Sequence, residues 1–237
     1  MIISTKGPMK VLLLFAHPDD EVIGAGGTIR KLANASATLR LVTFSAGAEG
    51  YTQLSEEQTI VAQRAREVAA VCQILGIQEH CTERWLDWDF RVSNQGYHAV
   101  IRHIREFQPD LIFTHSFADY NDHRVIHDTV VDGWYHAGVP CAMRLGPVWP
   151  HVLLYECEIL QPLADPSVVV DVTDTQAAKV AAMQAYGSQL DLVGGIFQLL
   201  EGRGLQRGHL IGAKYGEAFR RVTYRPAKVT DVARLRD

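Results

Sequence analysis

The sequence predicts an α/β protein, a Rossmann-like three-layer sandwich in which helices cover both faces of a mostly parallel central sheet. Short apolar runs alternate along the chain with segments of helical period, which is typical of parallel strands joined by helices. The first run, residues 11–16, is apolar throughout, as expected of a central strand that is covered on both faces. Right-handed crossovers between such strands lead to a doubly wound sheet.

The remaining elements follow from the same patterns. Further strands are expected at residues 39–44, 82–86, 111–114, 151–156 and 168–172. Helices are expected at residues 28–32, 55–75, 97–107, 122–135 and 174–186. Asp174 or Thr173 is expected to cap the last of these helices, and no element is predicted beyond Gly187.

The helix at residues 55–75 has distinct start and stop signals. Ser55 and Gln58 form a capping-box pattern, in which each side chain can pair with an amide at the start of the helix. Gly76 is expected to end it. Its predicted apolar face consists of Val61, Ala65, Val68, Ala69, Cys72 and Leu75.

The composition is that of an ordinary globular protein. The 237 residues contain no repeats or linker-like stretches, so residues 1–237 are expected to form a single domain. The net charge of −4 offers no broad attraction for nucleic acid or an anionic membrane. We recognise no signal-peptide pattern and no bilayer-length apolar run, and we expect a cytoplasmic protein. The four cysteines lack C-x-x-C spacing and are expected to be small buried hydrophobes in a reducing compartment.

Polar side chains gather directly after the first predicted strand, in the run His17-Pro18-Asp19-Asp20-Glu21. Ligands of open parallel sheets bind at the carboxyl ends of the strands. Gly24, Gly26 and Gly27 follow, but the G-x-G-x-x-G pattern is incomplete because position 29 is isoleucine. An acidic turn also suits a cation better than a pyrophosphate. One imidazole and one carboxylate three residues apart can share a metal ion, and a second carboxylate beside them could transfer a proton.

A second polar cluster follows the predicted strand at residues 111–114. A catalytic zinc usually takes three protein ligands and leaves a position open for water, so two ligands from the first cluster are not enough. The second cluster contains His115, His123 and His127, and the last two are spaced to share a helix face. Both clusters are expected at the same edge of the sheet, which favours a joint metal site.

These residues match a known family. Residues 16–21, Ala-His-Pro-Asp-Asp-Glu, resemble the A-H-P-D-D-E signature of the PIG-L/LmbE-like zinc-dependent N-deacetylases. Looser agreement, in the correct order, extends the resemblance over about residues 10–220. It comprises Gly47–Gly50, Arg64-x-x-Glu67, Leu75-Gly76, Asp122-His123, Ser188-Gln189 and Glu217-x-Phe219.

The resemblance implies roles for several residues. His17, Asp20 and His123 would bind Zn²⁺, although other divalent metals also suit two imidazoles and one carboxylate. Asp19 would act as general base, and Arg64 would line the substrate pocket. Glu49 and Tyr51 are further substrate-binding candidates. The Tyr51 ring could stack on a sugar face, as could those of Trp85, Trp88 and Phe90, but packing is an equally good role for them.

One position departs from the family pattern. Many members have H-P-D-H where this chain has Tyr120-Asn121-Asp122-His123, and the family's first histidine there helps to stabilise the oxyanion. Tyr120 could donate the same hydrogen bond, or His115 or His127 could do so, and the choice stays open. Asp122 is expected to accept the other N–H of His123 or to cap the helix. Glu21 is expected to support its turn through hydrogen bonds.

The resemblance therefore implies a zinc-dependent hydrolase that removes the N-acetyl group of an N-acetylglucosamine-type amino sugar or conjugate by metal-activated water. The expected partner is a small N-acetylated substrate, and a homo-oligomer is compatible with the family. One alternative is an amidase acting on another small amide, such as a thiol conjugate. The other is a non-enzymatic metal- or nucleotide-binding module, which would have no need of Asp19 beside the metal.

Overall fold

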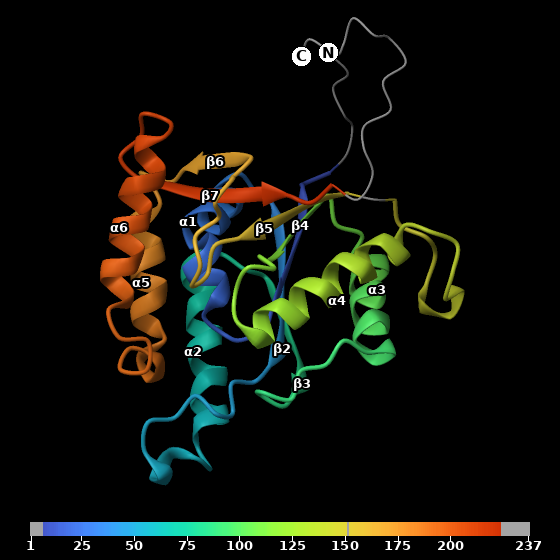
Figure 1. Ribbon diagram of the computed structural model, residues 1–237, viewed down its shortest axis with the longest axis horizontal. Helices are drawn as coiled ribbons and strands as arrows, with labels where there is room; N and C mark the ends of the chain where they lie inside the picture. The colour runs from blue at the N-terminus through green and yellow to red at the C-terminus, as the bar shows by residue number, and fades with distance from the viewer. Residues whose placement is uncertain (1–6, 151, 224–237) are drawn as a thin grey trace, which may run out of the picture.

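A seven-stranded sheet forms the centre of the molecule, in the order β3-β2-β1-β4-β5-β7-β6 (Figure 1). The computed structural model describes residues 7–150 and 152–223. The strands are β1 Lys10–Phe15, β2 Thr38–Ser45, β3 Glu79–Trp85, β4 Leu111–His115, β5 Leu153–Cys157, β6 Val168–Asp171 and β7 Gly216–Arg221. Strands β3, β2, β1, β4 and β5 pair in parallel, whereas β7 runs antiparallel to β5 and β6. The predicted mostly parallel sheet is confirmed.

Helices cover both faces of this sheet, which confirms the predicted layers. On one face lie α1 Asp20–Asn34, α2 Ile60–Leu75, α5 Gln176–Ala185 and α6 Ile196–His209 (Figure 1). On the other lie α3 Asn94–Phe107 and α4 Asn121–Ala137. Short 3₁₀ turns occur at η1 Leu54–Glu56, η2 Met143–Leu145 and η3 Gly187–Gln189.

The two cores follow from the alternation of side chains along β1. Val11, Leu13 and Phe15 pack into the core beneath α1 and α2, and Leu12 and Leu14 pack into the core beneath α3 and α4. All five are fully buried, as predicted for a strand covered on both faces.

The start of α2 differs from the prediction. The helix begins at Ile60, and the reciprocal capping box in this region joins Gln53 and Glu56 at η1, so the predicted box of Ser55 and Gln58 is wrong. Gly76 does end α2, at a φ of 79°. The buried face is also rotated by about one residue: it consists of Ile60, Arg64, Val68, Val71 and Leu75, while Val61, Ala65 and Ala69 are exposed. The sequence pattern did not reveal this face because the buried Arg64 interrupts the regular spacing of apolar residues along the helix.

Helix α1 is much longer than the predicted segment 28–32 because its glycines pack against other parts of the fold. A Cβ at Gly24 would lie 2.6 Å from Ile159 Cδ1, and one at Gly27 would lie 2.8 Å from Val172 Cβ. Glu217 on β7 accepts hydrogen bonds from the amides of Gly27 (2.9 Å) and Thr28 (2.7 Å). At Gly24 and Gly27, the missing side chain therefore lets other segments of the protein pack closely against α1.

Other expectations need smaller corrections. The N-cap of α5 is Thr175, not Asp174 or Thr173, and α6 and β7 lie in the region without a sequence-based prediction. His151 lies outside the described residues. Of the cysteines, only Cys157 is fully buried, and Cys81 is exposed. Among residues 7–150 and 152–223, no helix combines the length and apolarity needed to cross a bilayer.

Candidate active site

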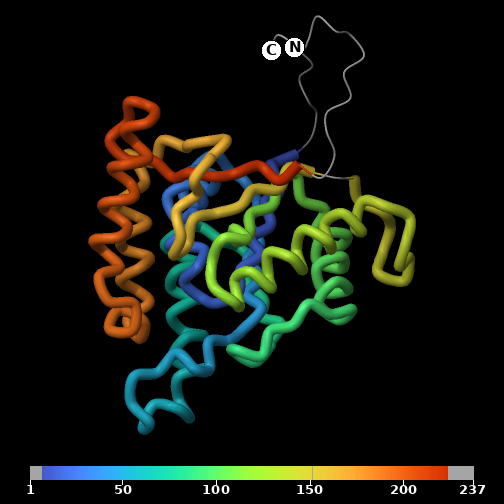
Figure 2. The backbone as a smooth tube through the Cα atoms, in the orientation of Figure 1, coloured from blue at the N-terminus to red at the C-terminus, as the bar shows by residue number. Residues whose placement is uncertain are grey.

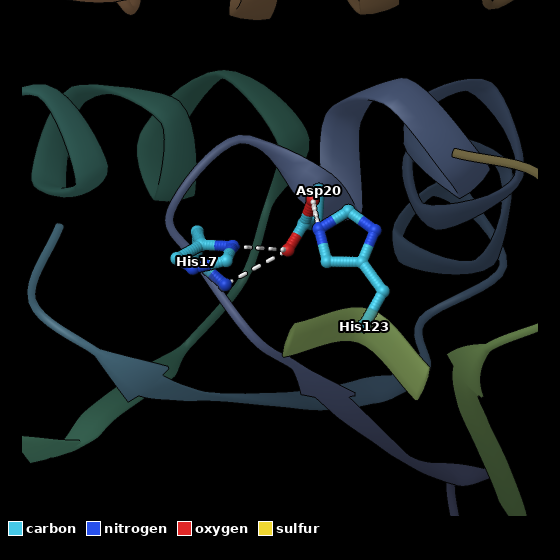
Figure 3. A group of neighbouring side chains, drawn as sticks. All are labelled: His17, Asp20 and His123. Atoms are coloured by element: carbon cyan, nitrogen blue, oxygen red, sulfur yellow. Dashed lines mark hydrogen bonds and ion pairs between the residues drawn. The ribbon is translucent and has the colours of Figure 1, made fainter. Parts of the chain in front are cut away.

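The ends of β1 and β4 bring the two polar clusters together. These strands pair directly, so the residues that follow them lie at the same edge of the sheet, as predicted. His17, Asp20 and His123 each contribute one potential ligand atom to a group whose atoms lie within 4.8 Å of one another (Figure 3). Asp20 lies between the two imidazoles: its Oδ1 is 3.2 Å from His123 Nε2, and its Oδ2 is 3.6 Å from His17 Nδ1.

This group fits a divalent metal ion. His123 Nε2 is buried, and within the described part of the chain it has no hydrogen-bond partner, so a nitrogen lone pair or proton is left facing Asp20. Two imidazoles and one carboxylate are a common donor set for catalytic metal sites, and they leave a tetrahedral position open. The three side chains could therefore hold a metal ion at the floor of a pocket.

The turn between β1 and α1 gives Asp19 an unusual backbone conformation, with a φ of 117°. Such a conformation is sparsely populated for a residue with a Cβ, so its surroundings must hold it. Glu21 accepts a hydrogen bond from the Asp19 amide (3.1 Å) and another from the Tyr186 hydroxyl (2.6 Å). The expected support of the turn by Glu21 is confirmed.

Burial and charge shift the pKa values of the groups in this turn. Burial raises the pKa of Asp19 to about 6, although the guanidinium of Arg64, 3.5 Å away, opposes the rise. Burial lowers the pKa of His17, but Asp122 and Asp20 outweigh it and raise the value to about 10. Protons and a divalent cation would therefore compete for the same imidazole, and metal binding would release protons.

The carboxylates behind the two imidazoles are paired differently from the prediction. Asp122 does not face His123: its Oδ2 lies 3.4 Å from His17 Nε2 and accepts a hydrogen bond from the Trp88 amide (3.1 Å). The carboxylate that faces His123 Nδ1, at 3.4 Å, belongs to Asp119. The N-cap of α4 is Tyr120, so the capping role proposed for Asp122 is also wrong. Asp119 precedes α4, and the turn that leads into the helix brings its carboxylate to His123, whereas the adjacent Asp122 faces His17.

The three candidate oxyanion donors occupy different places. Tyr120 lines the pocket beside His17 and His123. His115 is fully buried behind them, where its Nε2 accepts a hydrogen bond from the Ala16 amide (2.8 Å) and its ring stacks on His123. His127 pairs with Glu156 at 2.9 Å. Of the three, Tyr120 alone is among the described residues that line the pocket.

The pocket above the His–Asp–His group has a cavity volume of about 170 Å³. Arg64 and Glu49 line it, as expected, but Tyr51 is not among the described lining residues. Gly47 makes room for Arg64: its φ is +69°, and a Cβ there would lie 2.3 Å from the arginine Nε. Trp85 and Phe90 pack in the core instead of facing the pocket, and Phe90 stacks on His17.

Several lining residues were missed in the sequence. Asp87 follows β3, which ends at the same edge as β1, so the strand-end rule applied there would have found it. Trp88, one of the expected stacking candidates, lines the pocket next to it. Gln189 also lines the pocket and donates a hydrogen bond to the Gly50 carbonyl (3.0 Å). An aliphatic wall comes from Ile23, Ile159, Leu160, Leu192 and Val193. The sequence contains no local signal for this wall, because aliphatic residues that line a pocket cannot be told from aliphatic residues of a core.

The doubly wound sheet with a candidate metal group at its carboxyl edge defines an α/β protein of the kind that the sequence predicted. The chain belongs to the PIG-L family: the family model, described as GlcNAc-PI de-N-acetylase, matches residues 12–134. This is a family of deacetylases, and the predicted resemblance is confirmed.

Individual relatives span most of the chain. A 1D-myo-inositol 2-acetamido-2-deoxy-alpha-D-glucopyranoside deacetylase from Frankia casuarinae is 26% identical, and the match covers 82% of this chain and 84% of the relative. Among solved structures, the N,N'-diacetylchitobiose deacetylase from Pyrococcus horikoshii is 25% identical and covers 94% of this chain and 88% of its own, with a TM-score of 0.84. GalB, the 4-carboxy-2-hydroxymuconate hydratase from Pseudomonas putida, is 24% identical with a TM-score of 0.78 and covers 94% of this chain and all of its own. The last similarity concerns the fold alone.

Proposed function

We propose that this protein is a zinc-dependent N-deacetylase that acts on an N-acetylglucosamine-type amino sugar or a small conjugate of one. The observation that carries the proposal is that Asp19 lines the same pocket as the group formed by His17, Asp20 and His123. A protein that only bound a metal would not need a further buried carboxylate there. The names of the relatives from Frankia and Pyrococcus support the choice of an acetamido sugar.

In this proposal His17, Asp20 and His123 hold the metal ion. When bound, the ion acts as a Lewis acid that lowers the pKa of water and polarises the amide carbonyl. Asp19 takes a proton from the attacking water and returns it to the departing amine. Its backbone, fixed by Glu21 and by Arg64, which hydrogen-bonds to the Pro18 carbonyl, keeps the carboxylate aimed into the pocket.

Tyr120 is the proposed donor to the oxyanion that develops on the carbonyl oxygen. Its hydroxyl lies at the pocket floor, 3.4 Å from His17 Nδ1, which is the side of the imidazole that faces Asp20. A preorganised donor at such a position stabilises the charge of the transition state without reorganisation.

The two walls of the pocket suit an acetamido sugar. Glu49 and Arg64 stand on a polar side, where hydroxyl groups can form hydrogen bonds. Ile159 and Leu192 stand on the aliphatic side, which suits the acetyl methyl group and the C–H face of a sugar ring. We further propose that the protein acts as one domain in the cytoplasm.

Acetate release by the Zn²⁺-loaded protein tests the proposal. The panel consists of N-acetylglucosamine, its β-1,4 dimer, an inositol glycoside of N-acetylglucosamine and an N-acetylated cysteine conjugate. We expect turnover of at least one sugar and its loss on chelation. Turnover of the thiol conjugate alone would favour the amidase alternative. Stoichiometric Zn²⁺ binding without turnover of any amide would contradict a hydrolase.

A further inference from the structure

The buried carboxylate of Asp119 joins a metal-binding imidazole to one wall of the pocket. Asp119 lies between β4 and α4 and is only 4% exposed. On one side its Oδ1 accepts a hydrogen bond from the Tyr120 amide (2.9 Å) and lies 3.4 Å from His123 Nδ1. On the other side its Oδ2 accepts a hydrogen bond from the Leu160 amide (2.9 Å) and a longer one from the Gln161 amide (3.5 Å).

The segment that Asp119 holds is a structural part of the pocket. Ile159 and Leu160, which follow β5, both line the cavity, and the Leu160 side chain remains 41% exposed there. Arg203 on α6 holds the carbonyl side of this segment through hydrogen bonds to Glu158, Ile159 and Leu160. Asp119 accepts hydrogen bonds from the Leu160 and Gln161 amides of the same segment. One guanidinium and one carboxylate therefore form hydrogen bonds to the two sides of this wall, whose Ile159 side chain is buried in the core.

The same carboxylate determines how His123 presents its ring. Nδ1 faces Asp119 at 3.4 Å and Nε2 faces Asp20 at 3.2 Å. With a cation in place of a proton between Nε2 and Asp20, the negative charge of Asp119 would favour a proton on Nδ1. Carboxylates behind metal-binding histidines commonly fix the tautomer in this way. On the far side of the site, Asp122 similarly lies between His17 and the Trp88 amide.

We propose that Asp119 is a positioning residue that couples metal binding at His123 to the order of the pocket wall at residues 159–161. The coupling rests on the metal site of the proposed function but not on its reaction. A cation held by His123 on its Asp20 side would polarise the imidazole and strengthen the attraction between Nδ1–H and Asp119. The carboxylate would then be held in the geometry in which it accepts the hydrogen bond of the Leu160 amide. A filled metal site and a formed pocket wall then stabilise each other.

Two measurements test the proposal without any substrate. The first is the Zn²⁺ dissociation constant, obtained by competition with a chromophoric chelator, for the wild type, Asp119→Asn, Asp119→Ser and the control Asp128→Asn. Asp128 is a matched control because it also faces a histidine on α4, His127, but outside the pocket. We expect both Asp119 variants to bind Zn²⁺ about tenfold more weakly or worse. The control should bind as the wild type does.

The second measurement is amide hydrogen exchange of the peptide containing Leu160 and Gln161, with and without Zn²⁺. Zn²⁺ should slow exchange there in the wild type and in Asp128→Asn, but not in Asp119→Asn. A lower melting temperature with an unchanged Zn²⁺ dissociation constant would show a merely structural role and overturn the proposal. So would wild-type exchange at residues 160–161 that Zn²⁺ leaves unaltered, an outcome that needs no variant to fold. Absence of deacetylase turnover would contradict the proposed function but leave both readouts intact.

Discussion

The ring of Tyr120 lies parallel to that of His17, with 5° between the planes, 6.3 Å between the centroids and the hydroxyl oxygen 3.4 Å from Nδ1. Burial and the nearby carboxylates of Asp20 and Asp122 raise the pKa of Tyr120 above its usual value of 10. The phenol therefore stays protonated at neutral pH and can donate a hydrogen bond. This is the property that the proposed role of Tyr120 as donor to the oxyanion requires.

Tyr120→Phe should lower kcat for the deacetylated sugar about a hundredfold, because it removes one donor to the developing charge and keeps the ring. Zn²⁺ content and KM should change little, since the packing against His17 remains. Steady-state kinetics and metal analysis check this, with Tyr97→Phe as control because that hydroxyl bonds Asp132 on α4, outside the pocket-lining residues. An unchanged kcat would remove Tyr120 from the reaction.

Asp19→Asn should retain Zn²⁺ and lose at least about a hundredfold in kcat, because an amide cannot accept the proton of the attacking water. The substitution keeps the shape of the side chain and the hydrogen bond from the Asp19 amide to Glu21. Metal content by elemental analysis and kcat should be measured on the same preparation. Asp89→Asn, an exposed carboxylate paired with Arg91, is the control. Full turnover in Asp19→Asn would assign the base elsewhere.

His123→Ala should lower the Zn²⁺ content of the purified protein, because two remaining ligands hold the ion less well than three. His127→Ala should retain it, since that imidazole pairs with Glu156 and lies outside the His–Asp–His group. Elemental analysis after dialysis compares the two. Full Zn²⁺ occupancy in His123→Ala would show that another residue, His115 foremost, completes the site.

The mostly parallel sheet and the meeting of the two clusters could be predicted because both depend on patterns that are local in sequence. A continuous apolar run followed by His17 and Asp20 signals a buried strand that ends at a site, and the geometry of parallel sheets brings the next such strand end beside it. Figure 2 traces the chain between the strands. The segment between β2 and α2 projects from the molecule there.

The pairing within the site could not be predicted because it depends on side-chain direction over a few ångströms. Adjacency suggested that Asp122 would face His123, but the carboxylate that faces this imidazole belongs to Asp119, in the turn that precedes α4. The buried face of α2 was similarly misplaced because Arg64 points inward to Asp19 and the Pro18 carbonyl. In both cases a buried charged side chain, which folding patterns alone do not place inside a protein, determines the arrangement.

Arg105→Met should destabilise the fold by about 1–3 kcal/mol, since it leaves the buried carbonyl of Ala137 without a donor and the five partly buried carbonyls to water. The guanidinium of Arg105 is buried, and it donates to the carbonyls of His136, Ala137, Val139, Cys141, Ala142 and Gly146. These carbonyls belong to the end of α4 and the loop after it. Urea unfolding is the measurement, and the exposed Arg66→Met should change the free energy of unfolding by under about 0.5 kcal/mol. An equally small change in Arg105→Met would mean that water replaces the guanidinium.

Glu83→Gln should remove a stabilising interaction whose strength depends on pH. The hydrogen bond between Glu83 Oε1 and His103 Nε2, at 2.8 Å, lowers the pKa of Glu83 below its ordinary value of 4.5. Because the folded pKa lies below the unfolded one, the ionised carboxylate stabilises the fold at pH values above 4.5, and this contribution is lost as the pH falls through the folded pKa.

The free energy of unfolding of Glu83→Gln should therefore be lower than that of the wild type at pH 7, and the difference should shrink as the pH is lowered below 4.5. Comparing the two proteins at each pH cancels the effect of metal loss in acid, which both share. Glu57→Gln, at an exposed carboxylate, should show no such convergence. A difference between Glu83→Gln and wild type that stays constant down to about pH 3 would show that the pair stabilises through packing, because an electrostatic contribution must disappear once the carboxylate is protonated in both states.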